Sequence, residues 1–125
     1  MAGSITFSET THTSVKKLSM TWVSDVALGT VNAIPSEKSY TGMIERAVFI
    51  PDSGGTQPTN LYDVTITDSD GIDVLIGNGA NLVNTGAVQK DNVTDGLGAV
   101  VSTTLTLNIT NAGNSNGGEV ILYIR

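Results

Sequence analysis

The chain has no cysteine and one histidine, His12, among its 125 residues. Disulfides, zinc–thiolate sites and thiol nucleophiles are therefore excluded, because each of them needs a cysteine side chain. A single histidine also excludes any site that requires two imidazole groups. Aromatic residues make up 5% of the chain and charged residues 14%, against a usual charged share of about 25%. The chain is thus poor in the side chains from which catalytic and metal centres are built.

Basic residues are few, with six Lys and Arg against twelve Asp and Glu, and the formal net charge is −6. Nucleic-acid phosphates and anionic membrane surfaces attract basic patches, so we expect neither as a partner. Long hydrophobic runs are missing as well. The longest, AVFI at 47–50 and VILYI at 120–124, are far shorter than the about 20 residues that span a bilayer. The opening stretch MAGSITFSETTHTSVKK lacks the basic and apolar parts of a secretory signal, and we expect a soluble protein.

The polar residues that are present favour strands and turns. The chain contains 17 Thr, 11 Ser, 10 Asn and 14 Gly, and no window has convincing helical spacing of apolar residues. Apolar residues instead alternate with polar ones, which indicates half-buried strands. We therefore predict an all-β, single-domain antiparallel β-sandwich or jelly-roll-like barrel of about seven to eight strands.

The alternation and the turn signals set the expected order of elements. A hairpin turn is expected at Asp68–Gly71, and 77–98 is expected to be one long excursion with a short strand at 82–83 or 87–89. A hairpin loop is expected at 111–118. Residues 1–14 are interpreted as an N-terminal arm and 15–125 as the sandwich domain. The expected strands are 4–9, 15–24, 30–33, 40–50, 61–67, 72–76, 100–110 and 119–125.

Acidic residues near the expected hairpin are the first candidates for chemistry. Asp68, Asp70 and Gly71 resemble the start of a calcium loop, but the position that should carry a bidentate Glu is Gly79. An Asx-type turn, in which aspartates accept hydrogen bonds from nearby backbone N–H groups, is therefore favoured over an ion site. Whether this turn ever binds calcium stays open.

Two further candidates suggest catalysis only weakly. Asp63 and Asp73 could form a carboxylate pair of the glycosidase type, but Asp63 falls on the polar face of its strand, so solvated carboxylates are favoured. His12 has Ser8 and Ser14 nearby, yet any serine-rich chain offers such a pair. We therefore predict no catalytic residues, no metal ligands and no cofactor.

Apolar residues on expected outward faces are better evidence for a binding role. Ile121 and Tyr123 lie opposite the inward set of the last strand, and Met43 and Phe49 lie opposite Ile44 in the 40–50 strand. Exposed apolar patches mark protein–protein contacts. We predict Ile121, Tyr123, Met43 and Phe49 as partner-binding residues.

Three stretches resemble small structural proteins of tailed-bacteriophage virions, of the head decoration or cement type. They are YDVTITDSDGIDVLIGNGANLVNT at 62–85, GSITFSET at 3–10 and LTLNITNAGNSNGGEVILYIR at 105–125. The resemblance implies a non-enzymatic protein on the outer capsid surface, often a homotrimer, that clamps neighbouring major capsid subunits. We expect the 1–14 arm and the 77–98 excursion to make those contacts. The alternative is a carbohydrate- or receptor-binding β-sandwich module of a phage tail or fibre, which would need exposed aromatic residues beside the loop aspartates.

Overall fold

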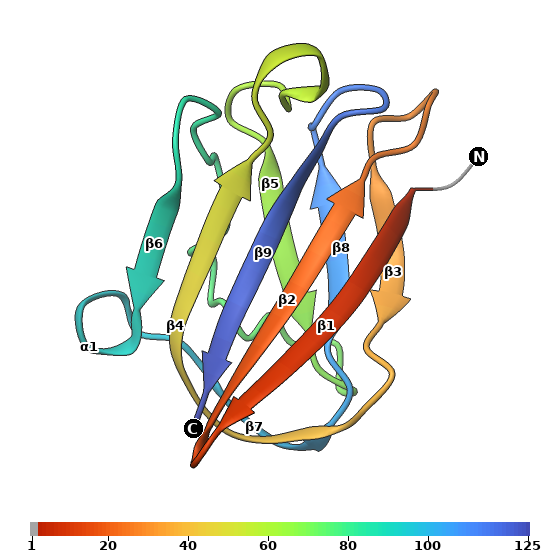
Figure 1. Ribbon diagram of the computed structural model, residues 1–125. Coiled ribbons are helices and arrows are strands. Elements are labelled where there is room, and N and C mark those ends of the chain that lie inside the picture. The colour runs from red at the N-terminus through yellow and green to blue at the C-terminus, as the bar shows by residue number, and fades with distance from the viewer. Residues whose placement is uncertain (1–2) are drawn as a thin grey trace.

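Figure 1 shows the computed structural model, which describes residues 3–125 apart from the side chains of residues 32 and 33. All strands pair antiparallel, so the all-β prediction is confirmed. Within the described range, no helix is long and apolar enough to cross a membrane. The elements are β1 (Ser4–His12), β2 (Val15–Val23), β3 (Val31–Pro35), β4 (Tyr40–Pro51), the 3-10 turn Gly54–Thr56, β5 (Asp63–Thr67), β6 (Val88–Asp91), α1 (Asn92–Asp95), β7 (Ala99–Thr103), β8 (Thr106–Thr110) and β9 (Gly117–Ile124).

The strands form two layers. The larger sheet has the order β1-β2-β9-β4-β6, with β7 paired to the first part of β4, and the smaller sheet has the order β3-β8-β5. Figure 1 shows the smaller sheet behind the larger one, so the pair makes a sandwich that curls into a half-barrel. One face of the larger sheet packs on the core, and no strand or helix of residues 3–125 lies over its other face.

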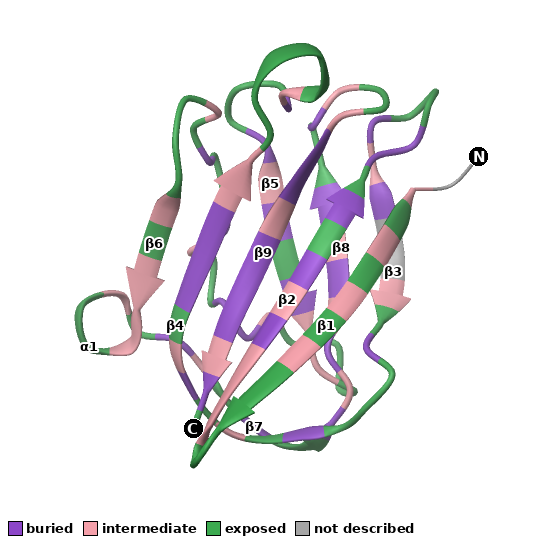
Figure 2. Ribbon diagram, in the orientation of Figure 1, coloured by how far each residue is buried: buried purple, intermediate pink, exposed green. Residues whose placement is uncertain are grey.

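The core lies between the layers and follows the alternation of the sequence. The inward residues of β2, Leu18, Met20 and Trp22, are almost completely buried, as are those of β8 and β9. Across the layers, the rings of Trp22 and Tyr62 lie 5.8 Å apart in a tilted arrangement. Figure 2 shows the resulting alternation of buried and exposed residues along β2. Alternation was thus a sound guide to the strands that are regular along their whole length.

Strand β4 departs from the alternation because it contains a bulge. Its pairing with β9 shifts between Ile44 and Arg46, which leaves Glu45 as an extra residue. A bulge moves the residues beyond it to the opposite face. Ile44, Ala47 and Phe49 consequently all face the core and have no exposed surface. The prediction that Phe49 faces outward was wrong for this reason.

The expected strand 100–110 is two strands in different sheets. β7 pairs with β4 in the larger sheet, whereas β8 pairs with β3 and β5 in the smaller one. The chain changes sheet at Thr104 and Leu105, and Leu105, Leu107 and Ile109 are fully buried as expected. Since β8 and β9 belong to different sheets, 111–118 crosses between the layers and is not the hairpin loop that we predicted.

The turn at Asp68–Gly71 is present, but the strand expected after it is not. Only one isolated bridge, Thr67 to Asp73, continues the pairing among the described residues, and the chain then turns repeatedly. The Asp73 carboxylate accepts hydrogen bonds from the N–H groups of Leu75 and Gly77 at 3.1 and 3.0 Å. A side chain that bonds the backbone two and four residues on favours a turn over an extended strand.

Most of the predicted N-terminal arm belongs to the sandwich. Ser4–His12 forms β1, which pairs with β2 along its full length. Ile5 and Phe7 alternate inward and pack against the core. The sandwich therefore begins inside the region that we had assigned to an arm, because these alternating residues find a partner strand within the same chain.

Candidate functional site: an apolar end and an open seam

The acidic turn is a structural element of the kind that the sequence favoured. The Asp68 carboxylate accepts hydrogen bonds from the N–H groups of Asp70 and Ile72 at 2.9 and 3.0 Å. This geometry is an Asx-type turn. Across residues 3–125, no three His, Asp or Glu side chains gather in a way that could hold a metal ion.

Asp63 and Asp73 sit at opposite ends of β5 and serve different loops. Asp63 pairs with Thr110 at one end, whereas Asp73 bridges Thr67 at the other. Four residue steps of strand place these two ends of the backbone about 13 Å apart. The Asp63 carboxylate accepts hydrogen bonds from the N–H of Asn81 and the side-chain amide of Asn111 at 2.8 and 2.6 Å. The structure therefore does not bring these two carboxylates together.

His12 and the four predicted partner-binding residues have different surroundings. His12 is exposed at the tip of the β1–β2 hairpin. Phe49 is fully buried, so it cannot contact a partner in this structure, whereas Met43 is 40% exposed. Ile121 and Tyr123 do face away from the core, on the uncovered face of the larger sheet.

That uncovered face exposes less apolar surface than the sequence indicated. Ile121 lies between Ser19 and Val48 on the neighbouring strands and is only 7% exposed. The Arg46 guanidinium lies 5.0 Å from the centre of the Tyr123 ring. Neighbouring side chains thus cover most of the apolar surface that Ile121 and Tyr123 contribute, although both residues point toward solvent.

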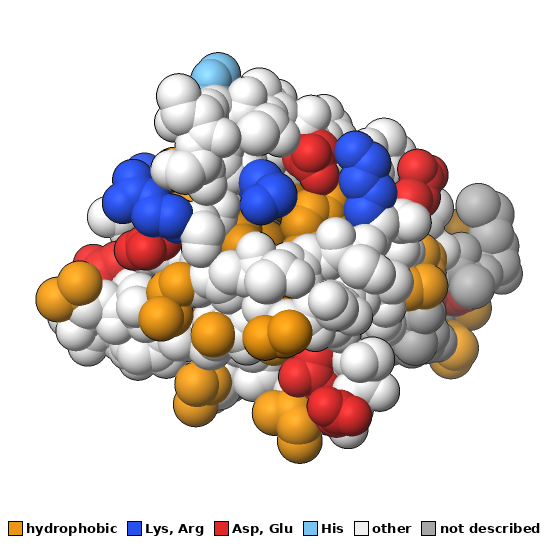
Figure 3. Space-filling view, turned by 90° about the horizontal axis from the view of Figure 1, so that it is seen from below, with side chains coloured by type: hydrophobic (Ala, Val, Ile, Leu, Met, Phe, Trp, Pro, Cys, Tyr) orange, Lys and Arg blue, Asp and Glu red, His pale blue; other side chains and the backbone are white. Residues whose placement is uncertain are grey.

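Exposed apolar residues occur at both ends of the sandwich, and five of them lie together at the lower end, away from the β2–β3 connection. Met43, Ile72, Ile76, Val93 and Val101 are between 40% and 94% exposed, and we call these five residues the apolar end. They come from four segments: β4, the loop after the acidic turn, α1 and β7. Figure 3 views the molecule from below and shows hydrophobic side chains spread over this surface.

Hydrogen bonds tie the four segments of the apolar end to one another. The N–H of Gly98 donates to the C=O of Val74 at 2.8 Å, and the Asn78 side chain donates to the C=O of Asp95 at 3.2 Å. The N–H of Ser102 donates to the Thr41 hydroxyl at 2.9 Å. Because these hydrogen bonds connect the segments, the apolar side chains lie on one connected surface and not on independent loops.

The larger and smaller sheets meet along their edge strands β1 and β3, and we call this junction the seam. The seam is closed at its upper end in Figure 1. Gly3 lies between the end of β2 and the start of β3, where a Cβ atom would meet the Val23 C=O at 2.6 Å and the Thr30 C=O at 2.7 Å. Such distances are too short for any side chain, so only glycine permits this approach. From this end the strands β1 and β3 diverge downward (Figure 1).

The lower end of the same seam is open and holds a cavity of about 210 Å³. Phe7, Leu18 and Tyr40 supply its apolar lining, and charged side chains stand at its rim. Figure 3 shows this hollow as a hydrophobic recess flanked by basic and acidic side chains. The cavity residues are Phe7, Ser8, Glu9, Leu18, Glu37, Lys38 and Tyr40.

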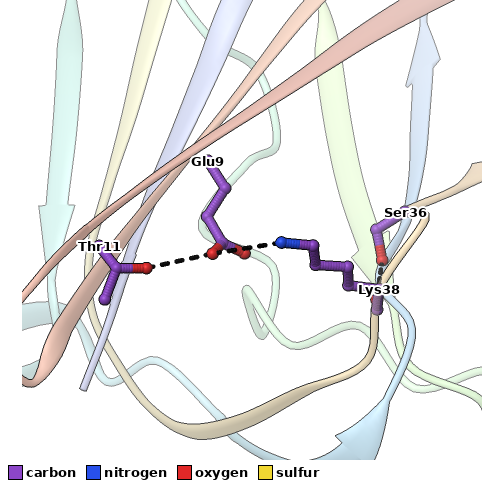
Figure 4. Close-up of polar contacts among 4 residues, drawn as sticks. All are labelled: Glu9, Thr11, Ser36 and Lys38. Atoms are coloured by element: carbon purple, nitrogen blue, oxygen red, sulfur yellow. Dashed lines mark hydrogen bonds and ion pairs between the residues drawn. The ribbon is translucent and has the colours of Figure 1, made fainter.

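Glu9 is the centre of the polar contacts at this opening. Its carboxylate accepts a hydrogen bond from the Thr11 hydroxyl at 3.1 Å and lies 3.7 Å from the Lys38 ammonium, as Figure 4 shows. Ser36 holds the segment opposite: its hydroxyl donates to the C=O of Lys38 at 2.7 Å and accepts from the N–H of Leu105 at 3.0 Å. The two sides of the opening are thus connected by side chains and not by a strand pair.

Tyr40 and Glu9 influence each other's ionisation. A hydrogen bond from the Tyr40 hydroxyl, with smaller contributions from Thr11 and Lys38, lowers the pKa of Glu9 below its usual 4.5. Burial, followed by the Glu9 carboxylate, raises the pKa of Tyr40 well above its usual 10.0. Glu9 is therefore a carboxylate, and Tyr40 a neutral donor, throughout the physiological pH range.

The opening could not be predicted from the sequence, because Glu9 and Lys38 are far apart in the chain and neither belongs to a motif. Val93 and Val101 could have been noticed as lone apolar residues among polar ones. Comparisons of the chain with protein-family models, with curated proteins and with solved structures found no match.

Proposed function

We propose that this protein is a non-enzymatic structural component that docks on a large protein assembly, of the kind represented by head decoration proteins of tailed phages. In this proposal the major capsid protein is the partner and the outer capsid surface is the location. The apolar end supplies the contact. The observation that carries the proposal is that five exposed apolar side chains share one surface whose segments are hydrogen bonded to one another.

Burial and charge support a protein partner for the apolar end. Large exposed apolar side chains are costly to leave in water, and grouped ones mark contacts with other proteins. Val93, at 94% exposed, and Val101, at 76%, pack on nothing in the described structure that would explain their hydrophobicity. Val93 also lies within 77–98, the excursion that the sequence analysis assigned to capsid contacts. The segment 62–85, which carries part of the resemblance, includes Ile72 and Ile76.

The alternative, a carbohydrate-binding module, has less support from the positions of the aromatic residues. Trp22, Tyr62 and Phe49 are buried in the core, and Tyr40 is 4% exposed. The acidic turn therefore has no exposed aromatic ring from these residues beside it on which a sugar could stack. The apolar end favours a protein surface over a sugar as the ligand.

The test is binding to expanded, undecorated heads of the phage that encodes the chain. We expect the double variant Val93→Asp/Val101→Asp to bind at least about tenfold more weakly than the unaltered protein, because both side chains would lose their apolar contact. Binding is measured by co-sedimentation at increasing protein concentration. Circular dichroism and thermal melting check that the variant is folded.

A matched control uses the opposite end of the sandwich. Val26 and Leu28, in the β2–β3 connection, are 55% and 71% exposed. The double variant Val26→Asp/Leu28→Asp carries the same change in charge and should bind as the unaltered protein does. The docking proposal fails if this control loses binding while Val93→Asp/Val101→Asp keeps it.

The proposed homotrimer is tested separately by light scattering at several concentrations. A particle of three times 13.0 kDa supports a three-fold symmetric arrangement. A monomer at every concentration contradicts a trimer in solution and restricts any three-fold arrangement to the assembled shell.

A further inference from the structure

The open seam combines an unpaired strand edge with a charged, apolar-lined cavity. We infer that this seam binds an extended strand of another protein, which pairs with the lower half of β1 and places a lysine or arginine side chain in the cavity. The inference goes beyond the proposed function and does not depend on it, because the residues of the apolar end do not line the cavity.

The backbone of β1 is free to accept such a strand. His12 and Val15 close the β1–β2 hairpin around a two-residue turn. In such a turn the closing pair is hydrogen bonded, and bonded and non-bonded pairs then alternate along the strands. The N–H and C=O groups of Phe7, Glu9 and Thr11 therefore point away from β2. Among the described residues, no further strand pairs with β1 on that side.

Three other edge strands, β3, β6 and β5, are interrupted, short or covered, which makes the β1 edge distinctive. β3 contains a register shift and ends at Pro35, and β6 is only four residues long and runs into α1. The free edge of β5 is covered, because the N–H of Val64 donates to Gly79 and that of Ile66 to Asp73. β1 has nine residues, no proline and no register shift. Long edges without such protection readily pair with other chains.

The cavity specifies the side chain that the guest strand should carry. Its lining by Phe7, Leu18 and the Tyr40 ring suits an aliphatic stem. Its rim carries two carboxylates, those of Glu9 and Glu37, and one ammonium group, that of Lys38. A long basic side chain buries its stem on apolar surface and keeps its charged head beside carboxylates. The net charge of −6 also attracts a basic segment at long range.

In the chain alone, the Lys38 ammonium lies beside Glu9, at the place that we assign to the guest cation. Its side chain is 68% exposed and its ammonium lies 3.7 Å from the Glu9 carboxylate, whereas the Glu9 side chain is 20% exposed. Exposed pairs of this length contribute little, so a guest cation can displace Lys38. Lys16 is on the same face as Leu18 and lies directly opposite Thr11, but it does not line the cavity.

Charge argues against a second copy of this chain as the guest. β1 is the unprotected strand, and its sequence SITFSETTH has Glu9 as its one charged residue and no lysine or arginine. Two β1 strands side by side would supply no cation for either cavity. The guest is therefore a strand from a different protein.

The experiment titrates the isotope-labelled full chain with a capped peptide, acetyl-Thr-Val-Lys-Val-Thr-amide, and follows the amide signals by NMR. We expect weak binding, with a Kd on the order of 1 mM, since a short flexible peptide loses much entropy when it is ordered. Shifts should concentrate on Phe7, Glu9, Thr11 and Lys38. Hydrogen exchange of the amides of Phe7, Glu9 and Thr11 should slow when the peptide is bound.

Two altered peptides separate the two parts of the inference. Replacing the peptide lysine by norleucine should weaken binding about tenfold, because the charge-assisted contact to Glu9 is lost. Methylating the backbone nitrogens should abolish slowed exchange, because strand pairing needs those N–H groups. Equal binding of the norleucine peptide overturns the assignment of a basic guest, and unchanged binding of the methylated peptide overturns strand pairing.

Two protein variants move binding in opposite directions. Glu9→Gln should weaken binding of the lysine peptide about tenfold, and Lys38→Ala should strengthen it about threefold by removing the competing ammonium. Lys90→Ala, on β6, changes the net charge equally and should alter affinity much less. The inference is overturned if Lys38→Ala and Lys90→Ala behave alike, or if the unliganded chain dimerises and buries the same amides.

Discussion

The two outer strands of the larger sheet, β1 and β6, both lie at an edge but differ in length and in how each strand ends. β6 has four residues and ends in α1, where the Asp91 carboxylate accepts from the N–H of Thr94 and the Asp95 carboxylate accepts from the N–H of Asp91. β1 has nine residues and no such cap. A protected edge keeps a sheet from pairing with other chains, whereas an open one is available for it.

The difference extends to what lies beneath each strand. Val88 of β6 faces Phe49 of β4 and packs against the core. β1 lies over the core only through Ile5 and Phe7, and beyond Phe7 it stands over the cavity. The sandwich is thus sealed along β6 and open along the lower half of β1. Edge strands of one sheet can therefore differ in function: β6 closes the sandwich, whereas β1 leaves backbone groups available for pairing.

Removing the side chain that anchors each edge gives the largest expected contrast. Phe7→Ala should lower the free energy of unfolding by about 3 kcal/mol, because a large aromatic ring is lost beside an existing cavity. Val88→Ala should lower it by about 1 kcal/mol, since fewer buried carbon atoms are removed. Urea unfolding measures both. Equal costs would mean that β1 is not held by the ring of Phe7.

Proline substitutions test which backbone groups of β1 face the free edge. Thr10→Pro should cost about 2 kcal/mol, because its N–H points toward β2 and a ladder hydrogen bond is lost. Thr11→Pro should cost less than about 1 kcal/mol, since its N–H points away from β2. Both residues are exposed threonines at neighbouring positions, so each is the other's control. The reverse order would contradict the assigned register and the free edge with it.

The pH dependence of stability should carry a signature of the seam. Tyr40 has a pKa raised above 10.0, so its contribution is present below pH 10 and is lost as the pH rises toward the folded-state value. Glu9 has a pKa lowered below 4.5, so its contribution is present above that pH and is lost as the pH falls through the folded-state value. Thermal melting from pH 3 to 11 should show the Tm falling at each end of this range, as an acid limb and an alkaline limb of the stability profile.

Two variants test which residue causes each decrease in stability. Tyr40→Phe should flatten the alkaline limb, and Glu9→Gln should flatten the acid one. Tyr62, whose pKa burial raises to about 12, should leave a smaller alkaline decline in Tyr40→Phe. An alkaline limb that is unchanged in Tyr40→Phe would show that the seam does not control stability at high pH.

The smallest expected effect is that of the ion pair across the opening. Lys38→Ala should change the free energy of unfolding by less than about 0.5 kcal/mol, because the pair with Glu9 is exposed. Lys90→Ala is the control on the β6 side. A loss well above that of the control would mean that Lys38 is a structural brace and not a displaceable occupant of the opening.

Much of the fold was predictable wherever a strand is regular. The alternation of Leu18, Met20 and Trp22, and that of Leu105, Leu107 and Ile109, correctly identified buried faces. The predictions failed where a single residue interrupts the pattern. Glu45 adds a bulge that reverses the sides of β4, and Asp73 bonds the backbone locally and turns the chain out of the expected strand.

The candidate surfaces were less predictable than the core. Phe49 was predicted to be exposed and is buried, whereas Val93 and Val101, which were not predicted to bind a partner, are highly exposed. Alternation reports which residues share a face of one strand but not which face another layer covers. Of the four residues predicted to bind a partner, Met43 is the one that lies at the apolar end.

Composition and period-two alternation were sufficient to predict the all-β class, most core residues and the absence of cysteine chemistry, because both are local properties of the chain. Tertiary structure alone decided that β7 and β8 enter different sheets, that Gly3 closes one end of the seam and that Glu9 meets Lys38 at the other. Those contacts join residues far apart in the chain. They arise only when two twisted layers stack and diverge, a geometry that no local pattern encodes.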